Sequence, residues 1–212
     1  MGRLVGGGSA ESVFRAVVLG AAASATVAAF ARPMPGAALV GLWGAAGAAL
    51  AAVVARSGPV PDGAFLAALG ISLAATLFGW GLATFGRAFR CPDPGAAICA
   101  MVAVVAGLTS LRWVDPIAER LPLDRRADFR RAVFGTDLAT AAAYDVAGYD
   151  RLHAPDVYED TTIASLPMAL PDVLPASAAW TVVGVGLAAL GHLVTVARRR
   201  RSIACGASEE SS

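Results

Sequence analysis

The feature that most restricts the fold of this chain is the clustering of its apolar residues into long runs separated by short turns rich in proline and glycine. Each run has about the 18 to 24 residues that a helix needs to cross roughly 30 Å of hydrocarbon. Hydrophobic residues make up 57% of the chain and charged residues 16%, whereas a soluble domain carries about 25% charged residues. We therefore predict an all-α fold, a polytopic transmembrane helical bundle.

Five runs meet the length requirement and predict five membrane spans. The predicted spans are 14–31, 37–55, 63–85, 94–111 and 176–197. Prolines in the intervening turns are expected to end one helix or to open the next. Residues 1–111 would then form a four-helix transmembrane region, followed by a polar loop over 112–175, the last span, and a basic tail over 198–212.

The first run also has the layout of a secretory signal peptide. Arg3 and Arg15 precede a short apolar stretch that ends in the sequence AFA at 29–31, a pattern that a signal peptidase cleaves. Glu11 within the basic region and Pro33 just after the site argue against cleavage. We expect the first helix to be retained, and cleavage would leave four spans.

Pairs of small residues recur one helical turn apart within the runs. They are Gly20 with Ser24, Gly44 with Ala48, and Gly184 with Ala188. Small residues at this spacing let two helix backbones approach closely in a membrane. The alternative is that alanine and glycine are simply abundant in this chain. Taken together, the pairs predict a tightly packed bundle.

The polar loop over 112–175 is the only sizeable polar segment, and its stretch 124–145 has two interpretations. Phe129, Val133 and Tyr144 recur near helical spacing, which predicts an amphipathic helix lying on the membrane surface. Alternatively, the loop forms a small domain that packs Phe129, Phe134 and Leu138 inward. Both interpretations stay open at this point.

Orientation is argued from arginines, because the chain contains no lysine. The block Arg198–Arg201 directly follows the last span, whereas six further arginines between 112 and 131 are interleaved with acids. One span separates the two clusters, so only one can follow the rule that basic loops face the cytoplasm. We favour a cytoplasmic C-terminus and an extracytoplasmic loop, with Trp113 and Trp180 marking one membrane interface.

Several chemical classes are excluded by missing residues. A phosphate-binding P-loop needs a lysine, so this chain is not a P-loop ATPase. No His-Glu-x-x-His or Cys-x-x-Cys spacing occurs, and the three cysteines, Cys91, Cys99 and Cys205, form no disulfide framework. We predict that the protein is not an enzyme, has no catalytic, cofactor or metal site, and binds no nucleic acid.

Two sets of ionisable residues remain as functional candidates. His192 lies in the last span near its basic end, where it could line a substrate path, the alternative being an ordinary interfacial histidine. A cluster of possible cation ligands lies in the loop, although acids in a polar loop are usually just solvated. The cluster contains Asp150, His153, Asp156, Glu159 and Asp160.

From about residue 65 to 201 the order of features resembles the membrane subunits of type 2 ABC exporters. A long apolar helix (FLAALGISLAATLFGWGLATF) ends in a short basic turn (GRAFRC), and a second apolar helix (PGAAICAMVAVVAGLTSL) follows. After it come an exit rich in aromatic and acidic residues (RWVDPIAERLP), a long outer loop, and a last helix ending in ARRRRS. The short turn at 32–36 departs from the family, because it leaves no room for a cytoplasmic helix.

The resemblance implies a permease in the cell membrane, a homodimer driven by a separate ATP-binding-cassette subunit. Arg87 and Arg90 in the basic turn would contact that ATPase, the alternative being that both are plain topology anchors. The alternative is a non-transporting scaffold or assembly protein whose outer loop binds a partner. An intramembrane enzyme would need paired acids or histidines within its spans.

Overall fold

The computed structural model describes residues 7–30, 43–44, 46–47, 63–146 and 172–209. These residues form helices and turns, with no strand among them. The helices are α1 (Gly7–Phe30), α3 (Ala64–Ala88), α4 (Asp93–Leu108), α5 (Ser110–Ala118), α6 (Leu123–Phe134), α7 (Leu138–Asp145) and α9 (Val173–Glu209). The all-helical class predicted from the sequence is therefore confirmed.

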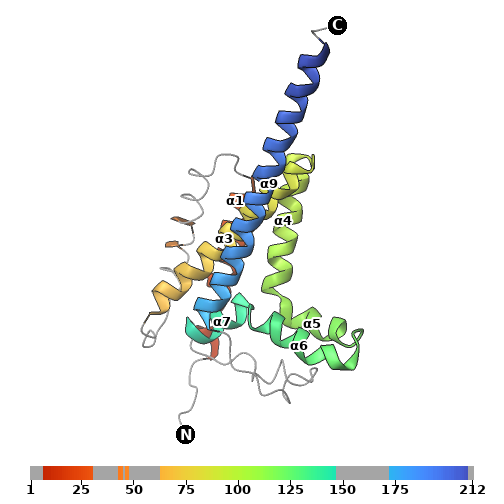
Figure 1. The fold of residues 1–212 in the computed structure, drawn as a ribbon. Coiled ribbons are helices and arrows are strands. Elements are labelled where there is room, and N and C mark those ends of the chain that lie inside the picture. Colours follow the sequence, from red (N-terminus) through yellow and green to blue (C-terminus); the bar gives the residue numbers. More distant parts are fainter. Residues whose placement is uncertain (1–6, 31–42, 45, 48–62, 147–171, 210–212) are drawn as a thin grey trace.

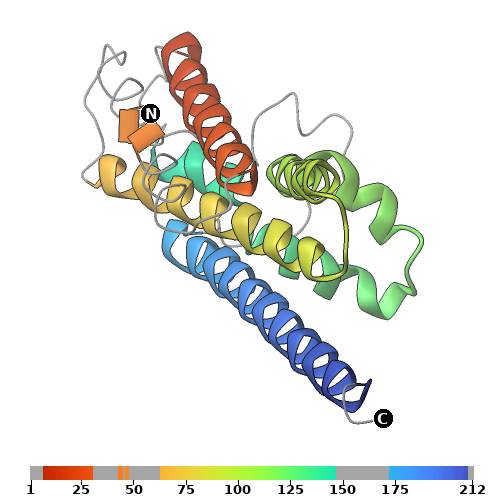
Figure 2. The ribbon, with the colours of Figure 1, turned by 90° about the horizontal axis from the view of Figure 1, so that it is seen from above.

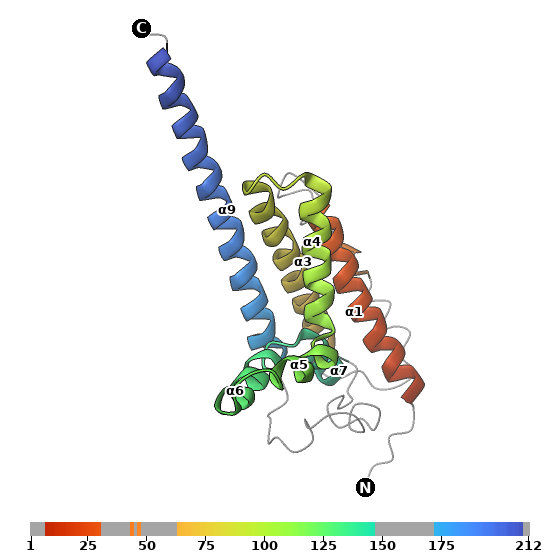
Figure 3. The ribbon, with the colours of Figure 1, turned by 90° about the vertical axis from the view of Figure 1, so that its right-hand side faces the viewer.

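Helix α3 occupies the centre of the bundle and contacts α1, α4 and α9. Figure 2 shows α3 lying between α1 and α9. Helices α1, α3 and α9 run in the same direction and α4 runs against them (Figures 1 and 3). The start of α9 lies beside Gly70 of α3, whereas Gly191 lies beside Phe85, near the end of α3.

The bundle has two chemically different ends. The basic end carries Arg87, Arg90 and Arg198, and α9 continues past it toward the C-terminus (Figure 3). The loop end carries α5, α6 and α7 (Figure 1). Helix α1 ends at the basic end, because Ala29 contacts Arg87 there, while α3 begins at the loop end. The predicted second span, 37–55, falls between these two points and lies almost wholly outside the described residues.

Small side chains fill the interior, and large apolar side chains face outward. Alanines make up most of the buried core, including Ala21, Ala68 and Ala75. Leu66 and Val182 are each 70% exposed. In water this arrangement would be unfavourable, because each Å² of apolar surface left exposed forgoes about 25 cal/mol. A membrane removes that cost and rewards close contact between small residues.

In the part of the chain that the structure describes, three helices are long and apolar enough to cross a membrane. They are Val13–Phe30, Ala64–Ala88 and Val173–Arg200. Helix α4 is apolar but has only 16 residues, a length of about 24 Å. It stops short of the predicted end at 111 because Thr109, with φ −110° and ψ 23°, leaves the helical conformation and α5 starts in a new direction. The described residues thus support a membrane protein without establishing five spans.

The single amphipathic helix predicted over 124–145 is not found, because this stretch forms α6 and α7. The break lies at Gly135–Asp137, where Asp137 is extended and its carboxylate accepts a hydrogen bond from Ala139 N at 3.0 Å. An aspartate in this position is a favourable helix N-cap. Phe134 and Leu138 are buried and Phe129 is partly buried, which agrees with the alternative of inward packing.

Helices α5, α6 and α7 form a polar layer that is fixed to the end of the bundle. Arg130 of α6 donates to Asp115 of α5 at 2.7 Å, and both side chains are almost fully buried. Asp145 accepts a hydrogen bond from Val173 N at the start of α9, at 3.0 Å. This carboxylate satisfies one of the free N–H groups at a helix N-terminus. The layer therefore depends on specific polar contacts as well as on apolar packing.

Candidate functional site at the basic end of the bundle

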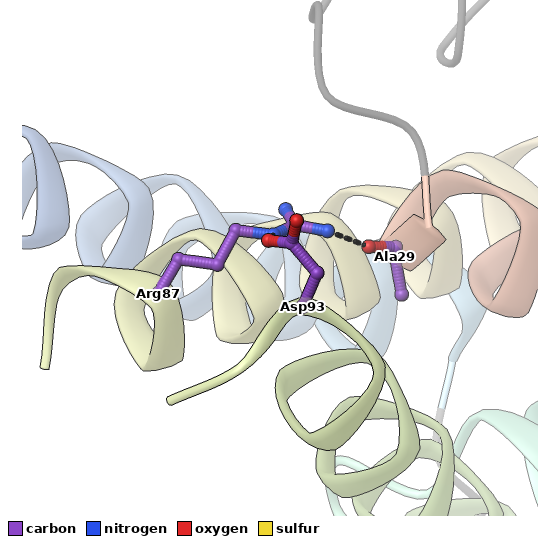
Figure 4. Close-up of polar contacts among 3 residues, drawn as sticks. All are labelled: Ala29, Arg87 and Asp93. Carbon is purple, nitrogen blue, oxygen red and sulfur yellow. Dashed lines mark hydrogen bonds and ion pairs between the residues drawn. The ribbon is translucent and has the colours of Figure 1, made fainter. Parts of the chain in front are cut away.

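Arg87, in the last turn of α3, joins three helices. Its Nε donates to Asp93 Oδ1 of α4 at 3.2 Å, and its Nη2 donates to the carbonyl oxygen of Ala29 in α1 (Figure 4). That carbonyl is one of the last four of α1, which have no partner within the helix. A cation at this position also interacts favourably with the negative end of the helix dipole. Arg87 is thus a cap for α1 and a link to α4.

Arg198 performs a similar role for α3. Its Nη1 donates to the carbonyl oxygen of Ala88, the last residue of α3. Its guanidinium carbon lies 5.7 Å from the centre of the Phe89 ring, a distance that permits a cation–π interaction. The Phe89 ring in turn lies 4.9 Å from that of Phe85. The basic block that follows the last span therefore starts with a residue engaged in the bundle.

The turn between α3 and α4 presents the exposed surface of this end. Arg90 has φ 62°, and it is the one described non-glycine residue with a positive φ. A left-handed backbone costs a side-chain-bearing residue about 1 kcal/mol or more. Arg90 is exposed, and its neighbour Phe89 is 55% exposed. The turn thus holds a cation and an aromatic ring outward, in a conformation that glycine would adopt more easily.

The three site residues predicted from the sequence have different environments. Arg87 has a side chain that is 19% exposed and engaged in the contacts described above, whereas Arg90 is free to meet another molecule. His192 is exposed on α9, next to Gly191, whose backbone lies against Phe85. Their proposed roles, ATPase contact for the arginines and a substrate path for His192, stay predictions.

Sequence reasoning missed the partners that organise this end. In the sequence, Phe89 is one residue of the basic turn and Arg198 one residue of the arginine block that indicates orientation, while Asp93 stands beside the turn prolines without a signal of its own. A capping pattern could have identified Asp93, because a basic residue closing one helix and an acid opening the next are a suitable pair. The contact of Arg198 with Ala88 joins residues 110 positions apart and leaves no local pattern.

Among the residues that the structure describes, no group of three His, Cys, Asp or Glu side chains could hold a metal ion. The acidic cluster around His153 lies outside them. Cys91 and Cys99 are free thiols. Comparison of the chain with protein-family models, with curated proteins and with solved structures gives no significant match.

Proposed function

We propose that this chain is a five-span protein of the cell membrane that acts as the permease subunit of a transporter, together with a separate ATPase. The observation that supports the ATPase contact is the turn at Phe89 and Arg90. Exposed groups held in a strained backbone conformation are frequent at functional sites, and this turn lies beside the arginine block of α9. An interaction with an acidic and apolar patch of a partner would use both side chains.

Five spans agree with the directions of the described helices. Helices α1, α3 and α9 are parallel, and α1 ends at the basic end whereas α3 begins at the loop end. The chain must therefore return to the loop end after α1, just as α4 returns it to the loop end after α3. The run 37–55 is long enough for that return. Under this topology the basic end is cytoplasmic and the polar layer is extracytoplasmic.

Charge distribution supports this orientation. At the loop end Arg130 pairs with Asp115 and Arg131 with Asp128. At the basic end, Arg90 and the block that begins with Arg198 form a cluster of cations next to the end of a span, which is the arrangement the positive-inside rule favours in the cytoplasm. A homodimer is part of the same proposal, with the exposed apolar side of the bundle available for it.

The test is affinity purification of the full chain, in mild detergent, from cells that contain its natural partners. Wild-type protein should co-purify with an ATP-binding-cassette subunit, and the purified chain alone should hydrolyse no ATP. Arg90→Glu should reduce the amount of ATPase recovered. Arg90→Gly should also reduce it, because glycine removes the cation while it suits the left-handed backbone of the turn. Arg125→Glu, an exposed arginine at the opposite end, is the matched control and should recover the ATPase normally.

Because a cytoplasmic arginine also influences membrane topology, each variant is checked for an unchanged orientation of its C-terminus. Full recovery of the ATPase with Arg90→Glu would show that Arg90 is not part of the contact. Absence of any ATPase from the wild-type preparation would contradict the permease proposal itself.

A non-transporting scaffold is the second candidate, and the exposed surface of the polar layer favours it. Leu123, at the start of α6, is 81% exposed, and Leu174, at the start of α9, is 82% exposed. Apolar side chains this exposed at the loop end are available to a partner protein. Leu123→Asp and Leu174→Asp should then abolish recovery of a partner other than an ATPase, while Arg90→Glu leaves it unchanged.

A further inference from the structure

A cavity of about 450 Å³ lies at the loop end, between the bundle and the polar layer. Its size is within the range of sites that bind small molecules, about 300 to 1,000 Å³. Helices α3, α4 and α9 form one side and α5 and α6 the other. Its lining includes four aromatic side chains: Phe78, Trp113, Phe129 and Trp180.

The Trp180 side chain is held in place by contacts with other residues of the lining. Trp180 Nε1 donates to the carbonyl oxygen of Thr136 at 2.8 Å, and its ring lies 4.7 Å from that of Phe78. A Cβ on Gly107 would lie 2.5 Å from the Trp180 ring, so the absence of a side chain there makes room for the indole. Because this indole N–H is already engaged, Trp180 presents apolar surface to a ligand.

Ser110 places a buried hydroxyl in the lining of the cavity. Ser110 is only 2% exposed, and its Oγ has no hydrogen-bond partner among the described atoms. Helical hydroxyls such as those of Ser24 and Thr76 donate to the carbonyl four residues earlier. Ser110 differs from these, because it is the first residue of α5 and follows the break at Thr109. The carbonyl of Ala106, four residues earlier, accepts from Trp113 Nε1 at 2.6 Å and from Thr109. The Ser110 hydroxyl thus lies in the lining of the cavity without a local bond.

The acid of the lining, Asp137, already has hydrogen-bond partners. The Asp137 carboxylate accepts from Ala139 N at 3.0 Å and from Thr140 Oγ1 at 2.5 Å. It therefore serves as the N-cap of α7. A hydroxyl left unpaired in an apolar cavity costs free energy. A water molecule could replace the missing bond only where it has two to four polar partners.

We propose that this cavity binds an uncharged, mostly apolar molecule with one hydroxyl or carbonyl group, which pairs with Ser110 Oγ while its chain contacts the aromatic walls. Such chemistry is found both in the acyl esters of membrane lipids and in free long-chain alcohols or esters. The proposal is independent of the ATPase contact at the basic end, so either can fail without the other.

The test uses the full chain with Trp43→Phe and Trp80→Phe, reconstituted in bilayer nanodiscs, so that the fluorescence comes from Trp113 and Trp180. The probes are dibromododecanol and dibromododecane, which quench indole fluorescence on contact and differ in the hydroxyl. Both should quench saturably, and the alcohol should bind more tightly. Ser110→Ala should weaken binding of the alcohol by roughly fivefold and leave binding of the alkane unchanged.

Two further variants make the result specific. Ala179→Phe, which places a ring in the cavity, should abolish saturable quenching by both probes. Ser177→Ala is the matched control, because Ser177 Oγ of α9 is, among the described residues, the other buried serine hydroxyl without a partner, and it borders a different cavity. This variant should change the binding of neither probe. Equal binding of the two probes, or no response to Ser110→Ala, would overturn the hydrogen-bond assignment. Saturable quenching that survives Ala179→Phe would overturn the site.

A final arm distinguishes the two sources of the ligand. In nanodiscs of phosphatidylcholine with brominated acyl chains, a bound lipid should quench the wild-type pair of tryptophans more strongly than the same pair in the Ala179→Phe variant. If that difference is present, the cavity holds a membrane lipid. If only the alcohol shows a difference, the ligand is a free amphiphile. Each variant is first compared with the parent for stability, so that a loss of quenching is not misread as unfolding.

Discussion

Gly81 of α3 faces Gly184 of α9 so closely that a Cβ placed on Gly81 would lie 2.0 Å from the Gly184 carbonyl oxygen. A Cβ on Gly184 would meet the Leu77 carbonyl oxygen at 2.6 Å. No side chain can occupy either position unless the two helices separate. Gly184, one of the small-residue pair seen in the sequence, is thus part of the contact that joins α3 to α9. Its partner Ala188, one turn later, is also buried.

Gly81→Ala should destabilise the bundle, with an expected loss of about 1 to 3 kcal/mol from overpacking. The clash is with backbone, which cannot move aside as a flexible side chain would. Gly186→Ala is the matched control, because nothing lies within 4 Å of its added Cβ. Thermal unfolding in detergent measures both variants. Equal midpoints for the two would show that α3 and α9 do not pack as closely as the structure has them.

Removing one member of the buried pair Asp115 and Arg130 should loosen the polar layer. Arg130→Met leaves the carboxylate uncompensated, and breaking a buried pair in this way costs about 3 kcal/mol or more. Arg131→Met is the control, since its pair with Asp128 is exposed and should be worth less than about 1 kcal/mol. Limited proteolysis of α5 and α6 reports the difference. Similar cleavage of both variants would argue against a structural role for the buried pair.

Loss of the Asp137 cap should weaken α7 specifically. Asp137→Ala removes the acceptor of Ala139 N and Thr140 Oγ1, at an expected cost of about 1 to 2 kcal/mol. Asp137→Asn keeps a side-chain oxygen and should retain most of the stability. Hydrogen exchange at the amides of α7 measures the effect. If the two variants exchange alike, the cap is not what starts this helix.

Topology can be tested with single cysteines in a variant that lacks Cys91, Cys99 and Cys205. In intact cells an impermeant thiol reagent should label a cysteine at Leu123, which is 81% exposed in the polar layer, and should not label one at Ser208. Permeabilised cells should expose both. The reverse pattern would place the polar layer in the cytoplasm and would remove the proposed ATPase contact from the cytoplasmic face.

The mature protein should retain α1. This helix contributes Val13, Val17, Ala21 and Ala25 to the buried core, and its Ala29 carbonyl accepts from Arg87. Cleavage after residue 31 would remove all of these contacts. Intact mass spectrometry of the membrane-extracted protein decides the question, and a mass that lacks residues 1–31 would show that the first run is a signal peptide.

The all-helical fold class and the association with a membrane could be predicted from the sequence, because a hydrocarbon layer constrains the length and polarity of each helix independently of its neighbours. Long apolar runs therefore predicted the apolar, membrane-length parts of α1, α3 and α9 to within three residues. They did not predict that α1 begins earlier, at Gly7, or that α9 continues to Glu209. The turn prolines likewise predicted the start of α4, where Pro92 precedes the helix and Pro94 lies in its first turn. Run length could not reveal the early end of α4 at Thr109, which is set by the local backbone.

Only the tertiary structure decided the roles of individual side chains. Arg87 and Arg90 are equivalent as sequence, yet one caps α1 and the other is exposed in a left-handed turn, because the approach of α1 and α4 determines which arginine has acceptors within reach. The Ser110 cavity likewise requires α9 to bring Trp180 against Gly107 and within hydrogen-bond distance of Thr136. Such contacts join residues distant in the chain, so no local pattern of residues records them.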